Sequence, residues 1–167
     1  MFTSLESFEK SYNIMIEGTG KILDTLTDES LDQSVNDDHR TLGRMAWHIV
    51  TTVPEMMGAI GMEVKSVAKD APLPKSAAEI AKSYRSVAGE LLAQIKKDWT
   101  DETLFKIDDL YGEKWPRGLT LKILADHEIH HRGQMTVLMR QAGLPVPGVF
   151  GPSKEEWSNY GAKPPEI

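Results

Sequence analysis

The five histidines are the side chains that most clearly suggest chemistry in this sequence, because three of them fall within the segment DHEIHH, residues 126–131. On an α-helix, residues four positions apart are separated by only about 40° around the axis. His127 and His131 would therefore share one face and could ligate one metal ion. His130 would lie about 60° to the other side of His127 and about 100° from His131, which separates it from that pair.

A third metal ligand should come from a different helix, and His48 is the best candidate. It lies in MAWHIV, residues 45–50, on the inward half of a predicted helix, whereas His39 lies in the polar run NDDHR and is expected to be solvated. The rival interpretation is a bundle whose core histidines are hydrogen-bonded and hold no metal. Burying three imidazoles without partners would be costly, so the sequence favours a metal site formed by His48, His127 and His131.

The run His127 to His131 also matches H-E-x-x-H, the helical motif of zinc proteases, in which Glu128 would act as general base beside the metal. Two features oppose that reading. No protease-like strand framework and no further ligand follow His131, and Glu128 would point about 100° away from His127. Gln134 shares the histidine face, where it could support a ligand, contact a substrate or lie at the edge of the core.

Four segments have the apolar periodicity of amphipathic helices, and they must position these side chains. They cover residues 8–26, 42–56, 76–95 and about 120–141. Thr41 is expected to cap the second helix, and Ser76 with Glu79 to form a capping box on the third. In the fourth, the stripe expected to face the core is Leu124, His127, His131, Gln134 and Leu138. The methionines 45, 56 and 135 are expected to fill the core.

Breaks in the periodicity divide the chain into four helices joined by long connections. This pattern predicts an all-α four-helix bundle. Pro54 should kink the second helix or end it early, and Gly143 should stop the fourth in a left-handed conformation. Residues 28–40 and 58–75 form the long connections, and residues 105–118 suggest a small hairpin before the last helix. We expect one domain over residues 1–167, with the Pro- and Gly-rich tail 144–167 packed on it.

Composition narrows the class of protein. The formal net charge is −6, which disfavours nucleic acid as a partner, and the absence of cysteine excludes disulfides, thiolate ligands and a cysteine nucleophile. No apolar run is long enough to span a membrane, and the first residues do not form a signal peptide. We therefore expect a cytoplasmic protein without a membrane partner.

Two motifs resemble the DinB/YfiT-like family of metal-dependent proteins: TLGRMAWH, residues 41–48, and DHEIHHRGQM, residues 126–135. The resemblance spans nearly the whole chain and implies a four-helix bundle with one metal ion. By motif position it implies the ligands His48, His127 and His131, and it gives His130 no ligand role. It thereby disfavours the zinc-protease reading of Glu128. It also implies homodimers, and members that use low-molecular-weight thiols in transfer or isomerisation reactions.

An ion bound by three neutral imidazoles keeps its double charge and an open position, where it could lower the pKa of water or bind a thiol as thiolate. We expect a metal-dependent enzyme of the thiol-transferase or hydrolase type, with zinc or nickel as metal and iron as a third candidate. Its partner would be a small-molecule substrate such as a thiol. The alternative is a non-catalytic metal-binding stress-response or interaction protein.

Overall fold

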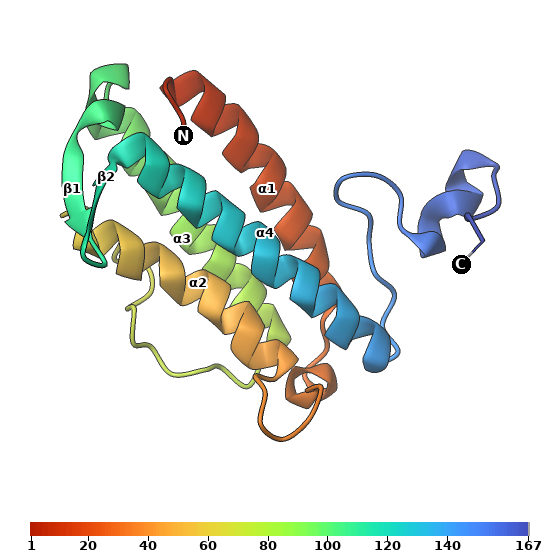
Figure 1. Ribbon diagram of the computed structural model, residues 1–167. Helices are drawn as coiled ribbons and strands as arrows, with labels where there is room; N and C mark the ends of the chain where they lie inside the picture. The colour runs from red at the N-terminus through yellow and green to blue at the C-terminus, as the bar shows by residue number, and fades with distance from the viewer. Residues whose placement is uncertain (167) are drawn as a thin grey trace.

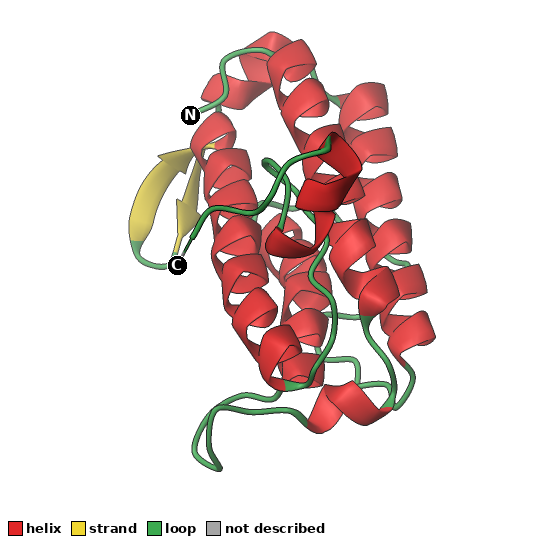
Figure 2. Cartoon of the chain, turned by 90° about the vertical axis from the view of Figure 1, so that its right-hand side faces the viewer, coloured by secondary structure: helices red, strands yellow, loops and turns green. Residues whose placement is uncertain are grey.

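Four α-helices form the body of the molecule and run side by side (Figures 1 and 2). They are α1 (Leu5–Thr25), α2 (Leu42–Ala59), α3 (Ala77–Asp98) and α4 (Arg117–Gln141). In the bundle, α1 and α2 each pack against both α3 and α4. This computed structural model describes residues 1–166, so the last residue of the predicted tail lies outside the described part. The arrangement confirms the predicted all-α four-helix bundle.

The core-facing stripe of α4 differs from the predicted one. Its buried residues follow alternating steps of four and three and include three charged side chains, Arg117 at the start of the helix and Glu128 and Arg132 in its middle, the last two at 2% and 4% exposure. His127 and His131 are only partly buried, and Gln134 is exposed. The histidines thus lie beside the buried stripe, on the edge of α4 that faces α2. The core positions of the three methionines are confirmed, since they are at most 9% exposed.

The helix ends confirm some of the predicted signals and correct others. The Thr41 hydroxyl accepts the Arg44 N–H at 3.1 Å, and Gly143 has the expected positive φ of 75°. The capping box at Ser76 is wrong, because the Ser76 side chain makes no capping bond. Instead the carboxylate of Asp28, from the connection between α1 and α2, accepts the Ala77 N–H at 2.7 Å. A charged acceptor makes the stronger bond to the end of a helix.

Pro54 does not end the second helix, since α2 continues through it to Ala59. The predicted hairpin is present as strands β1 (Ile107–Leu110) and β2 (Glu113–Pro116). Tyr111 and Gly112 both have positive φ, the pattern of the tight two-residue turn that matches strand twist. Short 3-10 helices η1 (Glu29–Asp32) and η2 (Asp101–Phe105) precede α2 and β1.

The segment after α4 first follows the bundle and then leaves it. Val146 is buried, and the guanidinium of Arg132 lies 5.3 Å from the centre of the Phe150 ring. The last 3-10 helix, η3 (Lys154–Tyr160), buries none of its residues and projects away from the four helices (Figure 1). The first half of the tail therefore packs on the bundle, whereas η3 contacts it through an ion pair between Glu155 and Arg140 at 3.7 Å.

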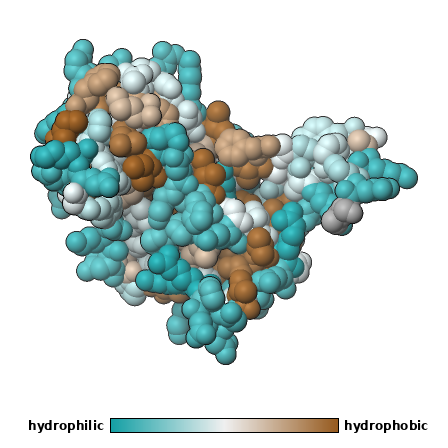
Figure 3. Space-filling view, viewed as in Figure 1, coloured by the Kyte–Doolittle hydropathy of each residue, from teal (hydrophilic) through white to brown (hydrophobic). Residues whose placement is uncertain are grey.

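The outer face in Figure 3 shows apolar groups set among hydrophilic ones rather than one continuous apolar belt. Within residues 1–166, none of the helices combines the length and apolar composition that a membrane span requires.

Close packing at Gly43 fixes the connection between α1 and α2. A Cβ at residue 43 would lie 2.9 Å from the Cβ of Leu31 and 3.1 Å from its carbonyl oxygen. Leu31 is buried within η1, and the Leu42 N–H donates to the Gln33 carbonyl at 2.7 Å. The start of α2 and the connection that precedes it are thus held as one unit.

Gly43→Ala should destabilise the protein by about 1–3 kcal/mol, because the added methyl group overpacks against Leu31. Gly58→Ala is the matched control in the same helix, since a Cβ there meets no heavy atom of the described chain within 4 Å. That control should be neutral or stabilising by up to about 1 kcal/mol. Urea unfolding of both variants checks the difference, and equal effects of the two substitutions would contradict the packing argument.

Candidate metal centre

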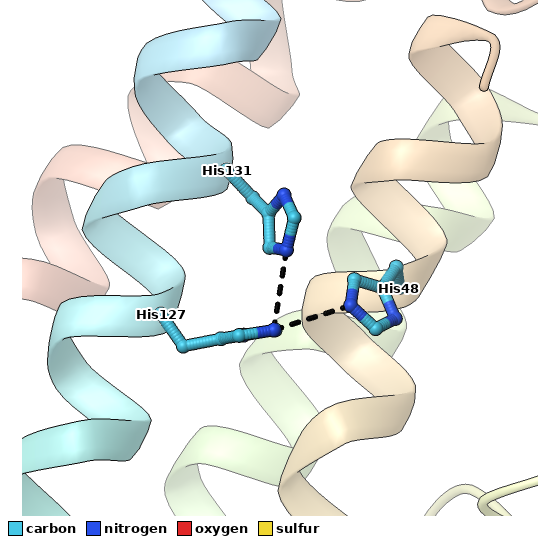
Figure 4. Close-up of side chains that lie close together, drawn as sticks. All are labelled: His48, His127 and His131. Atoms are coloured by element: carbon cyan, nitrogen blue, oxygen red, sulfur yellow. Dashed lines mark hydrogen bonds between the residues drawn. The ribbon is translucent and has the colours of Figure 1, made fainter. Parts of the chain in front are cut away.

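Three histidines from two neighbouring helices converge at one point, as Figure 4 shows. The Nε2 atom of His127 lies 3.1 Å from Nε2 of His131 and 3.2 Å from Nε2 of His48. One nitrogen from each ring lies within 4.8 Å of the others, and this three-histidine cluster could hold a metal ion. The structure therefore brings together the three residues that the sequence singles out as ligands.

Two of the separations among the three nitrogens fit a single small ion. Imidazole nitrogens bind zinc at about 2.0–2.1 Å, so two of them at tetrahedral angles lie about 3.3–3.4 Å apart. The observed separations of 3.1 and 3.2 Å are close to that value. Three imidazoles would supply three of the four ligands that zinc usually takes, so a bound ion would keep one position for another molecule.

Gln134 sets the protonation pattern of His131, one of the three clustered histidines. Its side-chain oxygen lies 2.7 Å from Nδ1 of His131. Because an amide oxygen only accepts hydrogen bonds, His131 carries its proton on Nδ1 and presents a lone pair on Nε2. Of the three roles open to Gln134 from the sequence, support of a ligand is the one that this contact favours.

All three rings favour the neutral form that binds metal. Burial, followed by the positive charge of Arg40, lowers the pKa of His48 to about 4. Burial and the neighbouring His131 lower the pKa of His127 to about 4. The pKa of His131 is also lowered by burial, although its bond to Gln134 acts in the opposite direction. At neutral pH the cluster therefore needs to release no proton before it binds an ion.

Glu128 follows His127 in the chain but faces away from the histidine cluster, into the centre of the bundle. Its Oε1 accepts hydrogen bonds from the hydroxyl of Thr19 on α1, at 2.6 Å, and of Tyr84 on α3, at 2.5 Å. Burial is the main reason that the pKa of this carboxyl is raised. Glu128 thus ties three helices together, and this position does not suit a proton-transfer group at the metal.

Arg132 completes a buried hydrogen-bond network that also contains Thr19, Tyr84 and Glu128. This network was not predicted from the sequence. The Arg132 guanidinium donates to the Thr19 hydroxyl at 3.0 Å, so one hydroxyl connects Arg132 to Glu128. A signal for the network exists in the sequence. Glu128 and Arg132 occupy positions of the buried stripe, and Thr19 lies on the apolar face of α1. Charged groups at such positions require partners from the helices opposite.

The two remaining histidines lie outside the cluster. His39 is exposed as predicted, and its Nδ1 lies 2.5 Å from the side-chain oxygen of Asn36. His130 is also exposed, and its ring centre lies 5.0 Å from that of His131. A cavity of about 500 Å³ adjoins the cluster, with His131 and Gln134 in its wall and His39 at its edge.

The fold and the cluster define a helical bundle with a three-histidine site that could hold a metal ion. The DinB family model matches residues 1–166, and the chain belongs to the DinB family.

Comparison with known proteins agrees with that assignment. The uncharacterized protein YrdA of Bacillus subtilis (strain 168) is 43% identical over the full length of both chains. A DinB-like protein from Bacillus cereus ATCC 10987 is 47% identical, with a TM-score of 0.86 over 90% of this chain and all of that one. The DinB-like protein YjoA of Bacillus subtilis shares the fold at 19% identity, with a TM-score of 0.67 over 86% of this chain and 96% of its own.

Thr19→Val should lower the free energy of unfolding by about 1–3 kcal/mol, because it leaves Glu128 and Arg132 buried with one partner fewer each. Thr136→Val is the matched control, since the Thr136 hydroxyl bonds only to the Gly133 carbonyl within α4. That control should change stability by less than about 0.5 kcal/mol. Urea unfolding measures both, and equal losses would show that the buried network does not stabilise the bundle.

The metal-free protein should lose stability as the pH falls from about 6.5 to about 4. Over this range histidines of the unfolded chain, with a pKa near 6.5, take up protons that folded His48 and His127 do not. Protonation therefore favours the unfolded state. A double variant, His48→Gln with His127→Gln, should show a weaker pH dependence in urea unfolding series with chelator present. Identical pH dependence in the two proteins would contradict the lowered pKa values.

Proposed function

We propose that this protein is a metal-dependent enzyme that binds one divalent ion through His48, His127 and His131. The observation that carries the proposal is the convergence of three imidazole nitrogens at metal-ligand spacing beside a cavity. Zinc and nickel suit an all-imidazole site, and iron is a third candidate. No cysteine or carboxylate takes part in the described cluster, so the ion's double charge would stay uncompensated by the protein.

The protein's own residues prepare the site in three ways. His48 on α2 and the pair on α4 hold their nitrogens in place across a helix–helix contact, so little reorganisation accompanies binding. Gln134 fixes the tautomer of His131. The cavity, which His131 lines, leaves room for a substrate next to the cluster. A bound ion would supply Lewis acidity and would stabilise an anion, such as a thiolate, at the open position.

The reaction class that we propose is transfer or hydrolysis with a low-molecular-weight thiol as cosubstrate. Support comes from the charge of the site, because a dication with three neutral ligands favours an anionic fourth ligand. The chain has no cysteine of its own, so a thiolate would have to come from a small molecule. A non-catalytic metal-binding protein has no use for an open metal position or for a cavity next to the cluster. The adjoining cavity therefore favours the enzyme.

Native protein should carry about one divalent ion per chain by mass spectrometry. His127→Ala should lower metal affinity by at least about 100-fold in competition with a chromophoric chelator, because it removes one of three ligands. His130→Ala is the matched control from the same helix and should bind metal like the native protein, since His130 lies outside the cluster.

Two outcomes would contradict the proposal at different points. Native protein without metal, or equal affinities of the His127→Ala and native proteins, would remove the site. Metal-loaded protein that shows no thiol-dependent turnover in a cosubstrate screen would favour the non-catalytic alternative. The screen should include both zinc-loaded and nickel-loaded protein, because purification can replace the native ion.

A further inference from the structure

The cavity beside the three-histidine cluster has a largely apolar lining, and among the described residues that line it Arg40 is the one Lys or Arg. Met45 of α2 and Leu138 of α4 form its floor, and two exposed side chains, Val35 and Val137, lie at its mouth. Isolated exposed valines are ordinary, but here both line the same cavity of about 500 Å³. A ligand with an apolar body would cover them.

Arg40 is the cation at the edge of this cavity. Within residues 1–166 its guanidinium has no hydrogen bond and no ion pair, and the side chain is exposed. Its charge nevertheless reaches the site, because Arg40 contributes to the lowered pKa of each of the three ligand histidines. A guanidinium with free donors next to an apolar cavity matches the planar oxygens of a carboxylate.

The charges around the cavity favour an anion even though the chain as a whole is acidic. Asp38 also lines the cavity and carries one negative charge. Arg40 cancels that charge, and Arg44 lies near enough to lower the pKa of His48. A bound dication would then leave the region strongly positive. His39 lines the same cavity, and its Nδ1 lies 2.5 Å from the side-chain oxygen of Asn36.

We propose that the cavity binds a small carboxylate with an apolar body, whose carboxylate contacts Arg40 and whose other end reaches the metal. The inference rests on the proposed function, since it takes the ion at the three histidines as the second anchor. A monoanion suits the site better than a phosphate, because one guanidinium faces the cavity and the Asp38 carboxylate would repel a second negative charge. Arg40 would thus select the substrate without taking part in the reaction.

Mercaptohexanoate and mercaptohexanol test this inference, because they share a thiol and an apolar chain and differ in the terminal carboxylate. Titration calorimetry on zinc-loaded protein should give about tenfold tighter binding of the acid. Arg40→Gln should reduce this preference to about one while leaving the affinity for the alcohol unchanged, and Arg40→Lys should restore part of it. Arg44→Gln, a matched loss of charge on α2, should keep most of the preference, because Arg44 does not line the cavity.

Cobalt-loaded protein separates failure of this inference from failure of the proposed function. A thiolate-to-cobalt absorption band with both probes, but equal affinities, would overturn the carboxylate site and leave the metal site standing. An unchanged preference in Arg40→Gln would also overturn the role of Arg40. The absence of a thiolate band with either probe would remove the open metal position, and the inference would fall with it.

Discussion

The buried carboxylate of Glu128 is the constraint on which the geometry of the candidate site depends. A carboxylate at 2% exposure is tolerable only where donors meet it, and here Thr19 and Tyr84 supply hydroxyls from two different helices. Those bonds fix the rotation of α4 about its own axis. With Glu128 directed at α1 and α3, the neighbouring edge of α4, about 60–100° around the helix axis, faces α2. His127 and His131 lie on that edge, and His48 meets them there.

The same hydrogen-bond network keeps the charged groups of Glu128 and Arg132 apart from the histidine cluster. Glu128 and Arg132 share the Thr19 hydroxyl inside the bundle, so their hydrogen bonds are directed away from the histidine cluster. The cluster itself contains only imidazoles. A carboxylate among the ligands would compensate part of an ion's charge and weaken its attraction for an anionic ligand. The position of Glu128, one residue from a ligand yet directed away from it, keeps that attraction intact.

Helical periodicity made the pairing of His127 with His131 predictable, because it depends only on residues four apart in one element. The third residue of the cluster came from a different helix, and its place in an apolar pattern was enough to identify it. The rotation of α4 about its own axis, which decides the side chains that face the core, was not predictable in the same way. The charged residues of α4 at 128 and 132 obscured the buried stripe, and the histidine stripe beside it looked more apolar. The cap on α3 failed for a related reason, since Asp28 reaches Ala77 from far along the chain.

The site combines a rigid part and a more adaptable part. The histidines lie on helices whose relative positions the core determines, whereas Arg40, His39 and Val35 lie on the connection between α1 and α2. That connection is anchored where Leu31 packs on Gly43, and its exposed residues beyond the anchor are free to change without disturbing the bundle. If both proposals hold, metal binding and ligand selection would depend on different elements of the fold. Substitutions in the connection between α1 and α2 could then alter which small molecule binds while the three-histidine cluster stays the same.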